Sequence, residues 1–168
     1  LTCGIVPISE NIPLSTILDN LGGGFYLSTR VIDIPRGSGL GTSSILAGAC
    51  IKAIFSFIGK PIEDNELFQR VLIMEQLMST GGGWQDQVGG VTNGIKFITT
   101  QAGLKQNICC EKVKVSKKTL EELEKRFVLI YTGQRRLARN LLREVVGKYI
   151  GNNKTSIEVL NEIQRVAC

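Results

Sequence analysis

The chain has 168 residues, of which 43% are hydrophobic and 21% charged, a balance that is ordinary for a soluble globular protein. No apolar run approaches the roughly 20 residues of a membrane-spanning helix, and the N-terminus lacks the pattern of a secretory signal, so we expect a cytoplasmic protein without a membrane partner. Histidine is absent and the five cysteines form no C-x-x-C pair, which excludes most zinc sites and every histidine-assisted nucleophile.

The first third of the chain predicts a strand and then a helix. Residues 25–32 mix aromatic and β-branched side chains, which is typical of a strand. A helix is expected to begin with Thr42 or Ser43 as its N-cap and to end before Gly59 and Pro61. Three- and four-residue spacing predicts that its buried face consists of Leu46, Cys50, Ala53 and Phe57.

A second helix and a hairpin are expected next. The helix covers residues 64–79 and has an apolar stripe formed by Leu67, Val71, Met74 and Met78. After a glycine-rich loop, residues 94–100 and 111–116 predict the two strands of a hairpin, with Cys109 and Cys110 in the loop between them.

The last part of the chain predicts one more strand and two helices. Residues 127–132 form a nearly continuous apolar run, as in a strand covered on both faces. A basic helix with Leu137, Leu141 and Val145 on one side follows, and residues 155–168 begin another helix. This mixed order of strands and helices favours the α+β class.

The positive charge is concentrated in the second part of the chain. Residues 105–168 hold 14 of the 20 Lys and Arg but 7 of the 15 acids, whereas residues 1–104 are net negative. No aromatic side chains alternate with these basic residues, so we favour a solvated helical face and expect no nucleic-acid partner. Because the chain starts with Leu1 and stops at Cys168 within a helical pattern, we expect it to be a piece of a longer chain.

The segment P-R-G-S-G-L-G-T-S-S, residues 35–44, is the first candidate site. Its glycines permit sharp turns and close approach of a ligand, and it leads into a helix whose N-terminus favours an anion. Its spacing matches neither the Walker A loop nor the Rossmann fingerprint. A tight loop that caps a helix remains the alternative interpretation.

Two carboxylates are the next candidates. Glu75 lies along the apolar stripe of the second helix, where it must find a partner unless it sits at the edge of the stripe and reaches water. Asp86 lies in T-G-G-G-W-Q-D-Q-V-G-G, residues 80–90, where glycines allow a substrate hydroxyl to come close to a catalytic base. Trp84 can pack against a sugar ring or in the core, and the flanking Gln85 and Gln87 are either sugar ligands or amides that stabilise the loop.

Together these segments resemble the GHMP kinase superfamily, whose second motif is P-x-x-x-G-L-G-S-S-A. The resemblance implies a two-domain α+β GHMP-kinase fold, here incomplete at both ends, that uses ATP and Mg²⁺. It implies that Ser43 and Glu75 bind Mg²⁺ and that Asp86 is the catalytic base. It also implies an ATP phosphate site formed by Gly37, Ser38, Gly39, Leu40, Gly41, Thr42, Ser43 and Ser44.

Within the superfamily, the segments at 35–49, 80–90 and 131–142 resemble the kinase domain of L-fucokinases. This implies transfer of a phosphoryl group from ATP to L-fucose, giving L-fucose 1-phosphate. A D-glycero-D-manno-heptose 7-phosphate kinase, another sugar kinase, or a catalytically silent binding module are the alternatives. Gly83, Trp84, Gln85 and Arg139 are the candidate sugar-binding residues, although Arg139 also fits a surface cation of a helix.

The resemblance also divides the chain. Residues 1–116 correspond to most of the N-terminal ATP-binding domain of a GHMP kinase, and residues 117–168 to the start of its C-terminal domain. The N-terminal substrate-binding motif and the C-terminal glycine-rich motif of the superfamily are missing. We therefore expect the 168-residue chain to have little kinase activity alone.

Overall fold

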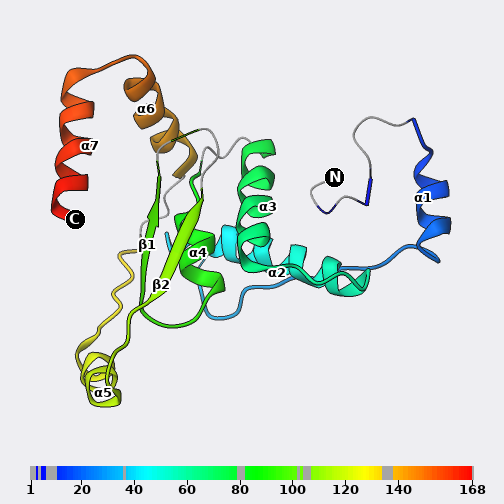
Figure 1. The fold of residues 1–168 in the computed structure, drawn as a ribbon, viewed down its shortest axis with the longest axis horizontal. Helices are drawn as coiled ribbons and strands as arrows, with labels where there is room; N and C mark the ends of the chain where they lie inside the picture. Colours follow the sequence, from blue (N-terminus) through cyan, green and yellow to red (C-terminus); the bar gives the residue numbers. More distant parts are fainter. Residues whose placement is uncertain are drawn as a thin grey trace.

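A computed structural model describes most of the chain (Figure 1). The described residues are 3, 5–6, 11–35, 37–78, 82–101, 103, 107–133 and 138–167, with the backbone alone described at 138–140. They form helices and one two-stranded sheet, which confirms the α+β class. The elements are α1 (Leu14–Asn20), α2 (Thr42–Phe57), α3 (Asp64–Leu77), α4 (Gln85–Val91), β1 (Lys96–Thr100), β2 (Ile108–Lys112), α5 (Lys117–Arg126), α6 (Ala138–Ile150) and α7 (Lys154–Ala167).

The core lies where α2, α3 and α4 meet at the centre of the molecule (Figure 1). Helix α2 packs against both α3 and α4, and the hairpin of β1 and β2 lies beside them. Burial of each large apolar side chain in this core contributes about 1.5–3 kcal/mol. The buried cluster consists of Ala47, Ile51, Phe55, Leu67 and Val71.

Helix α2 has the predicted extent but a different cap and a different buried face. Its N-cap is Gly41, with φ +65° and no side-chain cap, so the prediction of Thr42 or Ser43 was wrong. It ends before Gly59, as predicted. The buried residues are Ser44, Ala47, Gly48, Ile51 and Phe55, whereas Ala53 and Phe57 of the predicted face are exposed.

The buried face of α2 differs from the predicted one because α2 packs against two helices rather than one. A small residue, Gly48, meets the neighbouring helices: a Cβ placed on it would lie 3.1 Å from Val91 of α4 and 3.7 Å from Val71 of α3. The prediction of the buried face relies on large apolar side chains at helical spacing, so it leaves out glycine and serine. The predicted face was therefore wrong although the helix itself is confirmed.

Helix α3 largely follows its predicted stripe. Leu67 and Val71 are completely buried and Met74 is partly buried against the core. Met78 follows the last helical residue and is mostly exposed, so the C-terminal end of the stripe was wrong. Residue 79, the predicted end of this helix, lies outside the described residues.

The predicted hairpin is confirmed, with one shift along the chain. Strands β1 and β2 pair antiparallel, and Lys96 lies directly opposite Lys112 in their register. Cys109 and Cys110 belong to β2 rather than to the loop that precedes it, which corrects the sequence prediction. Both are free thiols.

Residues 25–32 and 127–132, each predicted as a strand, do not form one. The sheet in the described part of the chain contains β1 and β2 alone, so neither segment has a neighbouring strand. Backbone groups of an unpaired extended segment bond to water, and no ladder forms. Their apolar side chains remain exposed, as in Tyr26 at 91% and Phe127 at 78%.

The C-terminal helices agree with the predicted order. Helices α6 and α7 pack against each other, and α7 covers nearly all of the predicted 155–168. Leu141 is exposed and Val145 is partly so, while Leu137 lies outside the described residues. Within the described residues, no helix is both long and apolar enough to cross a bilayer. The division at residue 116 stays a prediction.

Candidate active site

The loop before α2 has the sharp backbone that its glycines predict. Gly37, Gly39 and Gly41 adopt φ values of +73°, +78° and +65°, a region that side chains with a Cβ rarely occupy. The amide of Ser38 donates to the carbonyl of Pro35 at 3.2 Å, which closes a turn. The Ser38 hydroxyl is buried and has no hydrogen-bond partner in the described structure. The phosphate-binding role of this loop stays a prediction.

Asp86 lies directly against this loop. A Cβ placed on Gly41 would be 2.8 Å from both Cβ and Cγ of Asp86 and 3.1 Å from its Oδ1. Asp86 is in the first turn of α4, and its side chain is solvent-exposed. The N-terminal end of α2 and the candidate base are thus neighbours, although 45 positions separate them in the sequence.

Glu75 is buried in the helix layer rather than at its edge. Its side chain is only 7% exposed, and Oε1 accepts a hydrogen bond from the hydroxyl of Ser44, which is 2% exposed. The interpretation in which Glu75 reaches water is therefore wrong, and the interpretation in which it finds a partner is confirmed. Burial of a carboxylate without a hydrogen-bond donor is costly, and the bond from Ser44 offsets part of that cost.

The structure pairs Glu75 with Ser44, whereas the motif assigns the magnesium role to Ser43. Ser43, the residue before Ser44, lies in the first turn of α2 and is exposed. Carboxylate and hydroxyl oxygens are suitable ligands for Mg²⁺, which retains water and phosphate oxygens around one or two protein carboxylates. The donors therefore fit the cation, and the choice between the two hydroxyls stays open. Among the described residues, no three acidic, Cys or His side chains converge as a metal cluster.

The glycine-rich stretch that carries Asp86 is partly a helix. Residues 79–81 lie outside the described part, but Gln85–Val91 form α4, so the prediction of a loop was wrong there. The glycines permit this packing: a Cβ on Gly90 would collide with the side chain of Ile45 on α2. Close contact with α2 stabilises a helix that its composition disfavours.

The candidate sugar-binding residues occupy different surroundings. Gly83 and Gln85 are exposed, and Trp84 is half-buried at the N-cap of α4. Gln87 is completely buried, and neither its amide oxygen nor its nitrogen has a partner in the described structure. The side chain of Arg139 lies outside the described residues. The sugar-binding roles stay predictions, and no pattern in the sequence indicates that Gln87 is buried.

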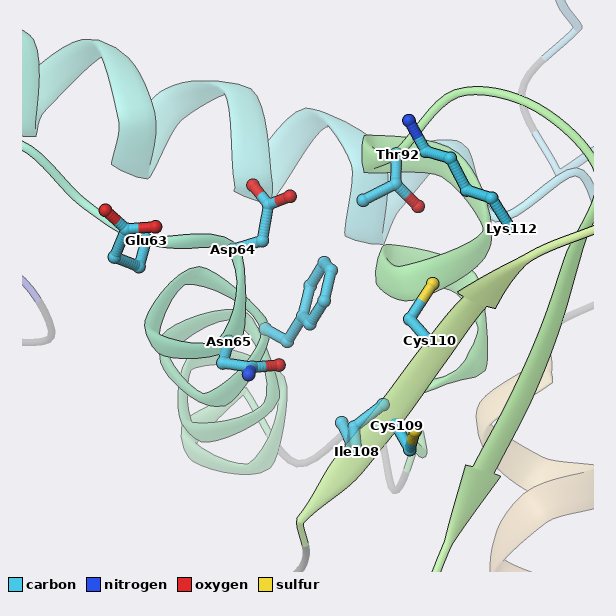
Figure 2. Close-up of a pocket in the computed structure, with 9 residues that line it drawn as sticks. Glu63, Asp64, Asn65, Thr92, Ile108, Cys109, Cys110 and Lys112 are labelled. Carbon is cyan, nitrogen blue, oxygen red and sulfur yellow. The ribbon is translucent and has the colours of Figure 1, made fainter.

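A separate pocket of about 430 Å³ lies at the other end of α3 (Figure 2). Figure 2 shows Asp64 at the start of α3, with Thr92 beyond α4 and Cys110 on β2 facing the same space. Glu75 is eleven residues further along α3, about 16 Å at 1.5 Å per residue. The lining residues are Glu63, Asp64, Asn65, Phe68, Thr92, Ile108, Cys109, Cys110 and Lys112. None is a predicted site residue.

The family model of the GHMP kinases N terminal domain matches residues 11–94 of the chain. This range contains the loop before α2, Glu75 and Asp86. No solved structure matches the chain.

Three curated relatives cover most of this chain. The bifunctional fucokinase/GDP-fucose pyrophosphorylase of Arabidopsis thaliana is 43% identical over 80% of the chain and 13% of its own length. The L-fucokinase/L-fucose-1-P guanylyltransferase of Bacteroides fragilis is 41% identical over 88% of the chain and 15% of its own length. The D-glycero-alpha-D-manno-heptose 7-phosphate kinase of Campylobacter jejuni is 29% identical over 80% of the chain and 39% of its own length. The chain thus spans less than half of each relative.

Proposed function

The chain belongs to the GHMP kinase family, and we propose that it forms part of a sugar kinase that converts ATP and L-fucose to ADP and L-fucose 1-phosphate. Two relatives at 41% and 43% identity are named as fucokinases, whereas the heptose 7-phosphate kinase is 29% identical. The contact between Gly41 and Asp86 carries the proposal, because it joins the loop before α2 to the candidate base.

The phosphates of ATP would lie at the loop of residues 37–44. Free amide groups at the first turn of α2 and the helix dipole favour an anion there. The left-handed glycines allow the backbone to approach the phosphate oxygens closely. Gly39 supports this interpretation, because a Cβ placed on it would meet no atom within 4 Å, so the space beside it is open.

Glu75, together with Ser43 or Ser44, would hold Mg²⁺. Bound there, the ion would neutralise charge on the β- and γ-phosphates during transfer. Before the ion binds, the hydroxyl of Ser44 keeps the buried carboxylate hydrogen-bonded. This hydrogen bond supports a carboxylate held beside the first turn of α2.

Asp86 would accept a hydrogen bond from the anomeric hydroxyl and orient its oxygen toward the γ-phosphorus. As the new O–P bond forms and the bond to the ADP oxygen breaks, the hydroxyl proton passes to the Asp86 carboxylate. The exposed carboxyl of Asp86 is accessible to such a substrate, and Trp84 next to it offers an apolar face to a sugar ring.

The test is a coupled ADP-release assay on the longest natural polypeptide that contains this chain. Its acceptors are L-fucose, other free hexoses and a heptose 7-phosphate, each at equal concentration. We expect L-fucose to give the highest kcat/KM, and the 168-residue chain alone to give little turnover because it spans 13–15% of the fucokinase relatives. Preference for the phosphorylated heptose would contradict the proposed acceptor, and no turnover with any sugar would contradict the kinase.

A further inference from the structure

The C-terminal end of α4 is bound by a single ammonium group, that of Lys96, the first residue of β1. Its Nζ donates to the carbonyl oxygen of Gly89 at 2.6 Å, to that of Val88 at 3.4 Å, and to that of Thr92. Gly94, with φ +92°, lies in the short link between α4 and β1 and lets the chain turn. A second donor, the hydroxyl of Thr92, reaches the carbonyl of Val88 at 2.9 Å.

Helix α4 needs such support because little in its own sequence stabilises it. It has seven residues, and isolated helices shorter than about 12–15 residues are marginal in water. Two of its residues, Gly89 and Gly90, each disfavour a helix by about 1 kcal/mol relative to alanine. Alanine cannot replace Gly90 without moving Ile45. The carbonyls of its last turn have no partner within the helix, and a cation at that end interacts favourably with the helix dipole.

Asp86 is at the opposite end of this helix. Two of the carbonyls that Lys96 binds belong to residues two and three positions after Asp86, and the third belongs to Thr92, just beyond the helix. Seven residues of helix span only about 10 Å. Because the helix is so short, movement of its C-terminal end also displaces its N-terminal turn. Asp86 is already in contact with Gly41, and a catalytic group must be held within about 0.5 Å of its working position.

We propose that Lys96 is a positioning residue: its ammonium fixes the C-terminal end of α4 and thereby keeps the carboxylate of Asp86 at the N-terminal end of α2. The inference rests on the proposed kinase function for its consequence in catalysis. The anchoring itself is a property of the fold and is measurable without any substrate. In this role Lys96 contacts no substrate and acts through α4.

The experiment compares Lys96→Met, Lys96→Arg and the control Lys112→Met. Lys112 is opposite Lys96 in the hairpin, so both Met variants remove one positive charge from the same cross-strand pair. In the described structure Lys112 donates no hydrogen bond to α4, unlike Lys96. Amide hydrogen exchange of residues 85–91 is measured by mass spectrometry, and kcat and KM are measured in the longest natural polypeptide that contains the chain.

We expect Lys96→Met to accelerate amide exchange over 85–91 by about tenfold, because it removes a cation that stabilises the C-terminal end of the helix. We also expect it to lower kcat by about tenfold with KM for ATP nearly unchanged, since a small misplacement of a reacting group affects the chemical step. Lys96→Arg should recover most of both losses, and Lys112→Met should behave like the unsubstituted protein.

Equal exchange over 85–91 in Lys96→Met and Lys112→Met would overturn the anchoring. Faster exchange with kcat unchanged would overturn the positioning of Asp86. If Lys96→Met does not fold, Lys96→Gln replaces it: this variant removes the charge but keeps a side chain that can donate a hydrogen bond, so exchange over 85–91 should accelerate by a smaller factor, and no change there would overturn the inference. Failure of the proposed function is distinguishable, because it appears as absence of turnover in the unsubstituted protein.

Discussion

Gly41→Ala tests the contact that joins the loop before α2 to the candidate base. Gly41 has φ +65°, and an added Cβ would lie 2.8 Å from Cβ and Cγ of Asp86. Ordinary contacts of a Cβ begin at 3.4 Å, so Asp86 or the start of α2 must move by about 0.6 Å. Such a shift would change the position of the Asp86 carboxylate relative to α2, and the proposed mechanism uses this carboxylate.

The magnitude has two parts. A residue with a Cβ in the left-handed region costs about 1–2 kcal/mol relative to glycine. Forcing a methyl group into an occupied space costs about 1–3 kcal/mol more. We therefore expect Gly41→Ala to lower the free energy of unfolding by roughly 2–5 kcal/mol, the sum of these two costs. In the longest natural polypeptide that contains the chain, kcat should fall by about 100-fold, the loss expected for a misplaced reacting group.

Gly39→Ala is the matched control, because Gly39 has φ +78° but an added Cβ would meet no atom within 4 Å. It should show the backbone cost alone, as measured by urea unfolding. The double variant Gly41→Ala, Asp86→Gly should recover the packing part of the loss in stability, though not the activity. If Gly39→Ala and Gly41→Ala destabilise the protein equally, and the double variant recovers nothing, Asp86 does not lie against Gly41 and the proposed site geometry is wrong.

Four further substitutions separate the roles of neighbouring side chains. Asp86→Asn should lower kcat by at least about 100-fold while ATP binding by calorimetry is retained, and a variant that keeps most of its rate would refute the base assignment. Ser44→Ala should lower the free energy of unfolding by about 1.5–3 kcal/mol, since it removes a hydrogen bond to a buried carboxylate. Ser43→Ala should leave stability unchanged and raise the Mg²⁺ concentration needed for half-maximal rate; the reverse pattern would move the magnesium role to Ser44. Gln87→Met should be neutral or stabilising in thermal unfolding because the buried amide has no partner in the described structure, and a raised KM for the sugar in the same variant would identify Gln87 as a ligand.

The sequence predicts best the structural features that depend on residues close together in the chain. The end of α2 before Gly59, the start of α3 at Asp64 and the pairing of β1 with β2 follow from turn residues and local periodicity, and these features are confirmed. The strand at 25–32 could not be judged locally, because a strand exists only where another segment supplies its hydrogen bonds. The buried face of α2 depends on how closely α3 and α4 approach, which the small residue Gly48 permits.

The glycines around Asp86 show why the site was only partly predictable. Glycine in a sequence predicts turns or room for a ligand, and both interpretations assume that its missing side chain leaves space. At Gly90 and Gly41 that space is already filled, by Ile45 and by Asp86 respectively, whereas Gly83 meets nothing within 4 Å. The glycines therefore act in two different ways. Some allow α4 to pack closely against α2, and others leave open space near Asp86. Only the second kind leaves room for the sugar of the proposed reaction, and the first kind brings Asp86 beside the loop before α2.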